Sequence, residues 1–288
     1  MRRFLGQVVR KLFGATPGVS PPRYGYSGRF QSWAEASSGT LGYRDPKIAT
    51  KVAHGAREVR TGKAVYERDS VTFSRRQYSF PVATALLWAG CKNNGKLHVL
   101  DFGGGFGTSF VQNQPFLGAL EHVDWTIVEQ PTFVAEARHV LGDADLIFES
   151  DIGESLRRGK PDLALISSSL QYVERPFEIL SRLIESEVEM IVLDRTLFSG
   201  ETDDLVTKQR VPEEIFPATI PVWIFSEAKF KTFMAARYTL ISRFASSQTT
   251  VDWDSEDRKL EELGFIYVLR GSAYDLLSEA TPYFLEKK

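Results

Sequence analysis

Residues 99–109, VLDFGGGFGTS, decide the fold that we predict for this chain. They include the end of an apolar run of strand length, which closes on the acid Asp101. Gly103, Gly105 and Gly107 then complete a D-x-G-x-G-x-G arrangement ahead of a helical pattern. Glycines let the backbone turn sharply and allow a ligand to approach more closely than any Cβ would permit. Because the following helix directs free N–H groups toward the same crevice, the pattern predicts a ligand-binding turn.

From residue 97 onward, apolar runs of strand length alternate with helical patterns. The five runs are LHVLDF (97–102), DWTIVEQ (124–130), LIFES (146–150), DLALISSS (162–169) and EMIVLDRT (189–196). This alternation is typical of βαβ units, so we predict an α/β fold with a mainly parallel sheet and helices on both faces. Two late strands, 238–245 and 264–271, suggest an antiparallel addition that makes seven strands in all. Residues 197–225 contain several prolines and are expected to form a long loop.

The chain is expected to have three parts. Residues 97–288 would form the α/β domain, and residues 23–96 would form a helical cap in front of it. Within the cap, Ser32 and Glu35 read as a capping box, and residues 45–63 carry apolar side chains at helical spacing. The third part is the amino-terminal segment that precedes the cap.

Residues 1–22 form this amphipathic segment. Apolar side chains recur at helical spacing over residues 4–13, and positive charge comes from Arg2, Arg3, Arg10 and Lys11. Such a helix can lie on an anionic membrane surface through residues 2–13. It can equally pack on its own domain or on a second copy of the chain in a homodimer, and the sequence leaves these alternatives open. The segment lacks the continuous apolar core and cleavage site of a secretory signal.

The composition is that of an ordinary globular protein in a reducing compartment. Hydrophobic residues make up 43% and charged residues 25% of the chain. A formal net charge of −2 gives no basic field that would favour nucleic acid. The single cysteine, Cys91, excludes an internal disulfide framework, and no apolar run approaches the roughly 20 residues of a membrane-spanning helix. We therefore expect a cytoplasmic protein, which would contact the inner face of the membrane if residues 2–13 bind lipid.

Three details indicate which ligand the glycine turn would take. The dinucleotide spacing G-x-G-x-x-G requires glycine or alanine at position 108, where Thr108 stands. Asp101 would meet a pyrophosphate with like charge, whereas S-adenosylmethionine has no phosphate and carries an ammonium and a sulfonium group. Glu129 ends the second strand, where a carboxylate can accept hydrogen bonds from both ribose hydroxyls. NAD enzymes share this third feature, so it supports a nucleoside in general.

Through VLDFGGGFG, IVEQ, SDIGE and SSSLQYV, the chain resembles the class I S-adenosylmethionine-dependent methyltransferases. Over nearly its whole length it also resembles a narrower group of bacterial methyltransferases whose genes often accompany surface-polysaccharide biosynthesis. The segments that carry this second resemblance are GYSGRFQSWAEA, GYRDPKI, YERDSVTF, LDFGGGFG, LDRT, QRVP and FPATIPVWIFS. The resemblance implies a Rossmann-like class I methyltransferase fold, S-adenosylmethionine as the cofactor, and a sugar, a lipid-linked sugar or a related small molecule as the acceptor.

For the cofactor site, the resemblance implies a set of six residues: Asp101, Gly103, Gly105, Gly107, Glu129 and Asp151. From its place after the third strand, Asp151 would accept a hydrogen bond from the adenine amino group, with Ile152 against the ring. A solvated loop carboxylate is the open alternative for Asp151. Gly104, Gln130 and Ser168 complete the predicted set, Ser168 because an open α/β sheet keeps its reacting groups at the ends of its strands.

Methyl transfer is an in-line displacement, which needs donor and acceptor held at attack distance in a dry pocket, and a hydroxyl acceptor also needs a base. Asp194, at the end of the fifth strand, and His54, in the cap, are the predicted candidates for that base. Glu67 and Asp69 are further candidates if the cap folds over the site. Each has a structural alternative, such as pairing of Asp194 with its neighbour. The predicted acceptor-binding residues are Tyr172, Arg195, Gln209, Arg210 and Trp223.

Two other functions stay open. An NAD-linked oxidoreductase or epimerase is disfavoured by Asp101 and by Thr108. A non-catalytic nucleoside-binding module would keep the fold and lose the chemistry. No metal is predicted, because the sequence shows no metal-binding spacing of His98, His122 and His139 with acids or with Cys91.

Overall fold

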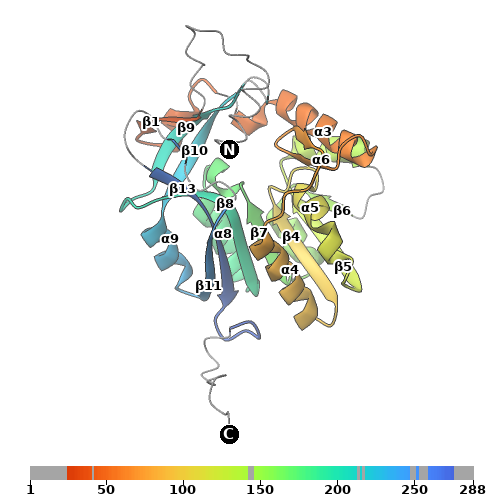
Figure 1. Ribbon diagram of the computed structural model, residues 1–288. Coiled ribbons are helices and arrows are strands. Elements are labelled where there is room, and N and C mark those ends of the chain that lie inside the picture. Colours follow the sequence, from red (N-terminus) through yellow and green to blue (C-terminus); the bar gives the residue numbers. More distant parts are fainter. Residues whose placement is uncertain are drawn as a thin grey trace.

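The computed structural model of the chain describes residues 25–40, 42–141, 146–212, 215, 218–246, 251–252 and 259–275. A mostly parallel sheet runs through its middle, with helices on both faces and the amino-terminal cap across one end (Figure 1). The predicted α/β fold with a mainly parallel sheet is therefore confirmed.

Five parallel strands form the middle of the sheet, in the spatial order β6-β5-β4-β7-β8. They are β4 (Lys96–Phe102), β5 (His122–Val128), β6 (Leu146–Glu149), β7 (Leu163–Ser167) and β8 (Met190–Ser199). Counted along the chain, this order is 3-2-1-4-5, the doubly wound arrangement, so the strand order reverses between β4 and β7. In open α/β sheets, ligands bind at the carboxyl ends of the strands beside such a reversal.

Three strands extend the sheet beyond β8. β13 (Lys259–Leu269) pairs antiparallel with β8, and β11 (Tyr238–Ala245) pairs antiparallel with β13. The short β12 (Val251–Asp252) also pairs with β13. The antiparallel addition predicted at this end of the sheet is confirmed.

Each face of the sheet packs against its own helices. The helices are α4 (Phe80–Lys92) and α5 (Thr108–Leu117) on one face, and α7 (Ile152–Arg158), α8 (Pro176–Glu185) and α9 (Glu227–Met234) on the other. In β7, Leu163 and Leu165 join the apolar cluster of α4 and α5, whereas Ala164 and Ile166 join that of α7, α8 and α9. Because such strands are buried on both faces, their sequences are continuous apolar runs.

The expectation of a long loop at residues 197–225 is wrong. β8 continues to Ser199, and it is followed by β9 (Leu205–Arg210) and β10 (Thr219–Ser226), which pair antiparallel. β10 joins the end of β8, and β1 (Gly25–Phe30) adds to β9, so the sheet of the described residues has eleven strands rather than seven. Pro221 lies inside β10, where it is tolerated because the pairing with β8 begins only beyond it, at Phe225.

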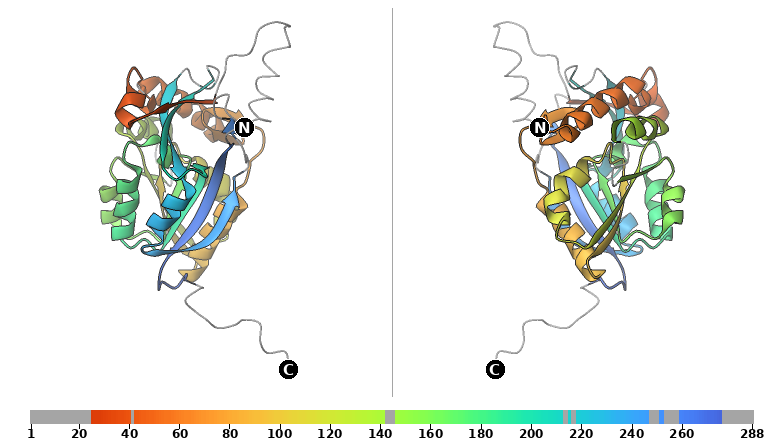
Figure 2. Two further views of the ribbon diagram at one scale, coloured as in Figure 1. Left: turned by 90° about the vertical axis from the view of Figure 1, so that its left-hand side faces the viewer. Right: turned by 90° about the vertical axis from the view of Figure 1, so that its right-hand side faces the viewer.

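The cap contains strands as well as the expected helices. Its elements after β1 are α2 (Trp33–Ser37), the 3₁₀ turn η1 (Gly42–Arg44), α3 (Pro46–Arg60), β2 (Tyr66–Arg68) and β3 (Val71–Phe73), and it packs on α6 (Pro131–Leu141). Ser32 accepts a hydrogen bond from the Glu35 N–H, as the capping box predicted. α3 buries Ile48 and Val52 in one cluster with Phe133 of α6. Figure 2 shows α3 above the same end of the sheet from two opposite sides.

The described helices and strands leave two predictions about the division of the chain untested. The amphipathic segment 1–22, with its contact to a membrane or to a second copy, lies outside the described residues. The domain boundary at residue 96 stays a prediction, and α4, which precedes it, packs on the sheet. Among the described helices, none has the length and apolar character needed to cross a membrane.

Candidate functional site

A cavity of about 320 Å³ lies at the carboxyl ends of β4, β5, β7 and β8, beneath the cap. This size is at the lower end for small-molecule sites, which often lie at the reversal of strand order. The central strands, with the loops and helices that follow them, contribute Phe102, Gly103, Gly104, Gly105, Thr108, Ser109, Val128, Glu129, Gln130, Pro131, Phe133, Ser150, Ser167, Ser168, Ser169, Tyr172, Val173 and Arg195. The cap contributes Tyr43, Val52, Glu67, Arg68 and Asp69.

The glycine turn forms the floor of the cavity. Gly103, Gly105 and Gly107 all have left-handed φ values, of 69°, 60° and 90°. A Cβ on Gly103 would lie 2.3 Å from the Ser169 Cβ, whereas a Cβ on Gly105 would meet no atom within 4 Å. The backbone at Gly105 is therefore open to a ligand. Gly107 does not line the cavity. Its left-handed backbone instead forms the N-cap position of α5.

Replacing Gly105 with alanine should weaken ligand binding and leave the fold intact. The left-handed backbone costs an alanine about 1–2 kcal/mol, and the new methyl group would stand in the space that a ligand needs. We expect the dissociation constant of S-adenosylhomocysteine, measured by calorimetry, to rise about tenfold, which corresponds to about 1.4 kcal/mol. Gly39→Ala is the matched control, because Gly39 has a φ of 74° and equally open surroundings but lies outside the cavity. Equal loss in both variants would contradict the prediction.

Asp101 lies beneath the turn and does not line the cavity. Its side chain is fully buried, and its carboxylate sits so close under Gly104 that a Cβ there would be 2.4 Å from Oδ2. Trp125 donates its indole N–H to Oδ2 at 3.1 Å, while Oδ1 has no hydrogen-bond partner. Burial raises the pKa of Asp101 to about 7. The sequence-based expectation that Asp101 would repel a pyrophosphate directly is therefore wrong. Asp101 acts on a ligand only through the turn above it.

Glu129 is the carboxylate that the cavity presents to a ligand. It follows β5, where Oε1 accepts the Gly105 N–H at 3.1 Å and Oε2 accepts the Gln130 N–H at 2.9 Å. Each carboxylate oxygen can accept a second hydrogen bond. Burial raises the pKa of Glu129, while the two N–H groups stabilise its ionised form. The side chain is thus held in place with one acceptor position left on each oxygen, which suits a pair of vicinal hydroxyls.

Asp151 and Ile152 are not brought to the cavity. Asp151 is exposed and caps α7, where Oδ1 accepts the Gly153 and Glu154 N–H groups. It also pairs with Arg182 at 3.2 Å, and this hydrogen bond is the main cause of its lowered pKa. Ile152 is buried in the core, and the cavity is lined instead by Ser150. The structure therefore places Asp151 where a helix cap requires it, and its predicted contact with adenine has no support from the cavity lining.

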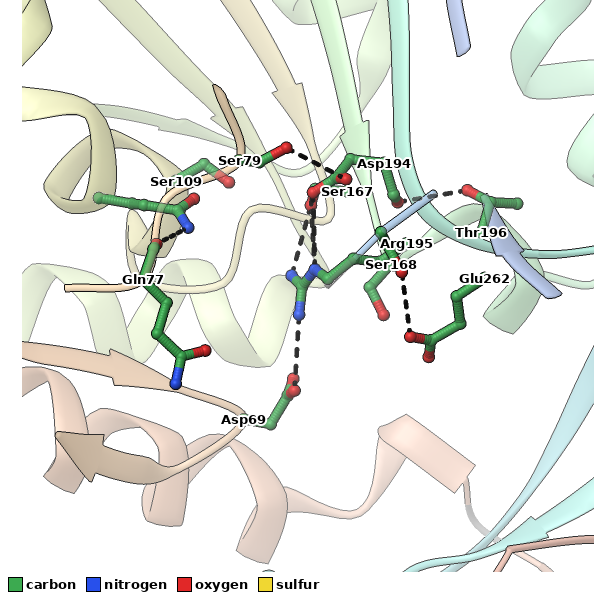
Figure 3. A network of polar contacts seen from close by, with 12 residues as sticks. Asp69, Gln77, Ser79, Ser109, Ser167, Ser168, Asp194, Arg195, Thr196 and Glu262 are labelled. Carbon is green, nitrogen blue, oxygen red and sulfur yellow. Dashed lines mark hydrogen bonds and ion pairs between the residues drawn. The ribbon is translucent and has the colours of Figure 1, made fainter. Parts of the chain in front are cut away.

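β8 carries a bulge where it reaches the cavity. Opposite the single residue Gly264 of β13, β8 places two residues, Asp194 and Arg195. Arg195 has a left-handed φ of 49°, which is uncommon for a non-glycine residue. Consecutive side chains of a regular strand point to opposite faces, but the bulge allows both side chains to join one polar network, drawn in Figure 3.

This network joins the sheet to the cap. Asp194 is buried and accepts a hydrogen bond from the Ser167 hydroxyl at 3.1 Å and a longer one from Ser79 at 3.5 Å. Arg195 donates to the Ser167 oxygen at 3.3 Å, and its guanidinium lies 3.7 Å from Asp194 and 3.8 Å from Asp69 of the cap. Asp194 itself does not line the cavity, whereas Ser167 does. Ser167 therefore stands between the cavity and the buried carboxylate.

Arg195 is charged and only loosely held. Burial alone would lower the pKa of Arg195, but the carboxylates of Asp69 and Asp194 raise it above its ordinary value. Its contacts of 3.3 to 3.8 Å are longer than the 2.7–2.9 Å of a good charge-assisted hydrogen bond. The guanidinium can therefore still donate hydrogen bonds to a ligand in the cavity.

Tyr172 lines the cavity, and Gln209 lies behind it. The Tyr172 hydroxyl donates to Gln209 Oε1 at 2.8 Å, and its ring meets the ring of Tyr43 edge-on at 5.1 Å. Burial raises the pKa of Tyr172, so its hydroxyl stays protonated. Of these predicted acceptor residues, Tyr172 is placed to touch a ligand and Gln209 to orient Tyr172.

The structure does not bring three predicted residues to the cavity. Trp223 stacks on Trp33 at 5.8 Å and donates its indole N–H to the Val173 carbonyl. Arg210 is exposed at the end of β9. His54 is exposed on α3, because this helix packs inward through the face that carries Val52 and Ala56. His54 is therefore not placed to act as a base.

The sequence alone missed several lining residues, among them Tyr43 and Phe133. Phe133 lies four residues after Glu129, in the first turn of α6, and this closeness in sequence is a signal that its ring borders the same pocket. Tyr43 stands four residues before Lys47, the Tyr-x-x-x-Lys spacing of many NAD-linked sugar enzymes, but the exposed Lys47 does not line the cavity.

Within the ranges that the structure describes, no group of three or more His, Cys, Asp or Glu side chains could hold a metal ion.

Comparison with known proteins finds likeness in structure alone. No protein-family model matches the sequence, and no curated protein matches it. Among solved structures, the chain is similar to the N-terminal domain of EvdMO1 with S-adenosylhomocysteine (SAH) bound, at 16% identity and a TM-score of 0.47, over 77% of this chain and 97% of that one.

Two further similar structures are methyltransferases. The 1,6-didemethyltoxoflavin-N1-methyltransferase of Burkholderia thailandensis has 15% identity and a TM-score of 0.44, over 88% of this chain and 99% of that one. Magnesium protoporphyrin IX methyltransferase from Synechocystis PCC 6803 has 15% identity and a TM-score of 0.41, over 78% of this chain and 97% of that one. Since one fold serves many functions, the chemistry has to be argued from the residues of the site.

Proposed function

We propose that this protein is an S-adenosylmethionine-dependent methyltransferase that acts on a hydroxyl group of a small acceptor. The observation that carries the proposal is the carboxylate of Glu129, held by two backbone N–H groups beside the open backbone of Gly105. It follows β5, the neighbour of β4 at the reversal of strand order, and it suits the two hydroxyls of a ribose. The glycine turn, with its missing Cβ atoms, would hold the part of the ligand that follows the ribose.

The charges around the cavity favour S-adenosylmethionine over a dinucleotide. The carboxylates of Glu67, Asp69 and Glu129 line the cavity, against the guanidinium groups of Arg68 and Arg195. A pyrophosphate would need a surplus of donors and positive charge. A ligand with a sulfonium and an ammonium group suits the surplus of carboxylates. When bound, this cofactor supplies the electrophilic methyl group.

The polar network on β8 provides the residues for the acceptor. The Ser167 hydroxyl, which lines the cavity, donates to the buried carboxylate of Asp194. Asp194 acts as the general base, and the proton of the acceptor hydroxyl reaches it through Ser167. Arg195 donates hydrogen bonds to other hydroxyls of the acceptor, and Asp69 accepts hydrogen bonds from them. These contacts hold the acceptor for in-line attack. The Tyr172 and Tyr43 rings exclude water from the same wall.

The proposed acceptor is a sugar or a lipid-linked sugar of surface-polysaccharide biosynthesis. This part of the proposal rests on the sequence resemblance, and the mixture of tyrosine rings with charged hydrogen-bonding groups in the cavity suits a sugar. A cytoplasmic protein whose residues 2–13 touch the inner face of the membrane would meet such lipid-linked precursors. Pairing of two copies through the same segment is the competing proposal for residues 2–13.

The proposal is tested by calorimetric titration of the purified protein with S-adenosylhomocysteine, the product form of the cofactor, and with NAD in parallel. We expect saturable binding of S-adenosylhomocysteine and no binding of NAD. Binding of NAD alone would favour an oxidoreductase or epimerase. Absence of binding for both ligands would favour a protein that kept the fold and lost the cofactor site.

A further inference from the structure

Glu67 is a buried carboxylate that the cap inserts beside the glycine turn. It is 4% exposed and lines the cavity. Its Oε2 accepts a hydrogen bond from the Thr108 hydroxyl at 3.1 Å, and its Oε1 accepts the Ser70 N–H at 2.7 Å. α3 leaves room for this side chain, because a Cβ on Gly55 would lie 2.7 Å from the Glu67 Cγ. The cap is therefore shaped around a carboxylate at this point.

The hairpin that carries Glu67 has a strained turn. Between β2 and β3, Asp69 and Ser70 both have left-handed φ values, of 53° and 66°, although neither is a glycine. Two-residue hairpins of this kind usually place glycine or asparagine at such positions, and strain of this sort persists mainly at binding sites. The turn directs two acids to different places, with Asp69 beside Arg195 and Glu67 beside Thr108.

Glu67 has no direct ion pair within the described part of the chain, and Arg195 stabilises its charge only from a distance. Among the ion pairs of the described residues, none joins Glu67 to a lysine, arginine or histidine. Burial raises its pKa to about 7, although the Ser70 N–H and the Thr108 hydroxyl favour the ionised form. A buried carboxylate in this state is stabilised by any cation that a ligand brings.

Glu67 and Glu129, two of the acids that line the cavity, lie on either side of the glycine turn. Glu129 accepts the Gly105 N–H within the turn, while Glu67 contacts Thr108, the first residue of α5. A nucleoside whose ribose hydroxyls are bound to Glu129 would therefore extend its 5′ substituent across the turn toward Glu67. At that end, the first N–H groups of α5 are donors without partners inside the helix, which favour a carboxylate.

From this arrangement we infer that Glu67 binds the α-ammonium group of the methionine part of the cofactor, with the amino end of α5 facing its carboxylate. This inference rests on the proposed function, since it assigns one end of the same cofactor. It makes the cap part of the cofactor site, so a ligand without the amino acid would lose the contact with the cap. The closing of the cap over the sheet would then depend on the charged end of the cofactor.

The test compares two ligands that share the nucleoside. S-adenosylhomocysteine carries the amino acid, and 5′-methylthioadenosine lacks it. We expect Glu67→Gln to raise the dissociation constant of S-adenosylhomocysteine at least tenfold, and to change that of 5′-methylthioadenosine by less than twofold. Glu58→Gln, a matched change on α3 outside the cavity lining, should alter neither constant. Glu67→Asp, which keeps the charge, should preserve the preference for S-adenosylhomocysteine and also serves if Glu67→Gln does not fold.

The other outcomes separate this inference from the proposed function. Equal loss of both ligands in Glu67→Gln would mean that Glu67 only shapes the turn, and would overturn the inference. The same holds if neither constant changes, or if the unaltered protein binds both ligands equally well. Failure of the unaltered protein to bind either ligand would instead refute the proposed function itself, and the inference with it.

Discussion

Replacement of Glu129 by alanine lowers the affinity for S-adenosylhomocysteine by at least about a hundredfold. The ribose hydroxyls would donate two hydrogen bonds to an ionised carboxylate, and each such bond contributes about 1.5–3 kcal/mol. Since every 1.4 kcal/mol changes a dissociation constant tenfold, even the lower estimate for two bonds gives a change of this size. Calorimetric titration measures it directly, and thermal unfolding verifies that the variant is folded.

Two further variants separate the ribose contact from the support of the turn. Glu129 also accepts the Gly105 N–H, so its loss could act by distorting the backbone. Glu129→Gln keeps one side-chain oxygen for that N–H. We expect its affinity for S-adenosylhomocysteine to lie between that of the unaltered protein and that of Glu129→Ala. Glu178→Gln, on the exposed surface of α8, should bind normally. Normal affinity in Glu129→Ala would show that the nucleoside does not lie on β5.

The second large effect concerns turnover rather than binding. Asp194→Asn should lower the rate of methyl transfer to a hydroxyl by about 10²–10⁴, the usual contribution of a general base. The amide keeps the size of the side chain and can still accept a hydrogen bond from Ser167, but it cannot take up the proton. The affinity for S-adenosylhomocysteine should stay within about twofold, because Asp194 does not line the cavity.

The rate is measured as transfer of a labelled methyl group from S-adenosylmethionine to the best substrate in a panel of nucleotide-activated and lipid-linked sugars. Ser167→Ala should slow the same reaction, because the proton reaches Asp194 through this hydroxyl. Asp162→Asn, a change outside the cavity lining, should leave the rate unaltered. A rate for Asp194→Asn that equals that of the unaltered protein would remove Asp194 from the mechanism.

Features that depend on neighbours along the chain could be predicted from the sequence. The glycine turn is one, because left-handed φ values are easiest for glycine wherever the turn lies in the fold. The central strands are another, since a strand buried on both faces needs an apolar residue at nearly every position. The position of Glu129 near the ligand could be predicted from the turn and the strands together, because Glu129 comes directly after a central strand. The SDIGE segment carried a local signal as well: Asp151 and Glu154 have the spacing of a helix cap, and the structure places Asp151 as one.

Features that depend on pairing between distant segments could not be predicted. β9 and β10 appeared to be a loop, because prolines argue against strands unless the partner strand is known to leave them unpaired. The two residues Asp194 and Arg195 share one network only because β13, some 70 residues later, supplies a single glycine opposite them. His54 faces away from the cavity because α3 packs on α6 through its other face. Glu67 reaches the cavity because β2 packs between α3 and α5.

The sequence by itself thus determined the class of fold, the turn and the carboxylate at the end of β5. The tertiary structure decided which acids line the cavity and which lie behind it. The physical reason is that a backbone conformation or an apolar run is set by local sterics and burial, while the surroundings of a carboxylate come from segments far apart in the chain. Glu67, Asp69, Asp101 and Asp194 are alike as residues, and only their burial, their donors and their nearest cations make them different.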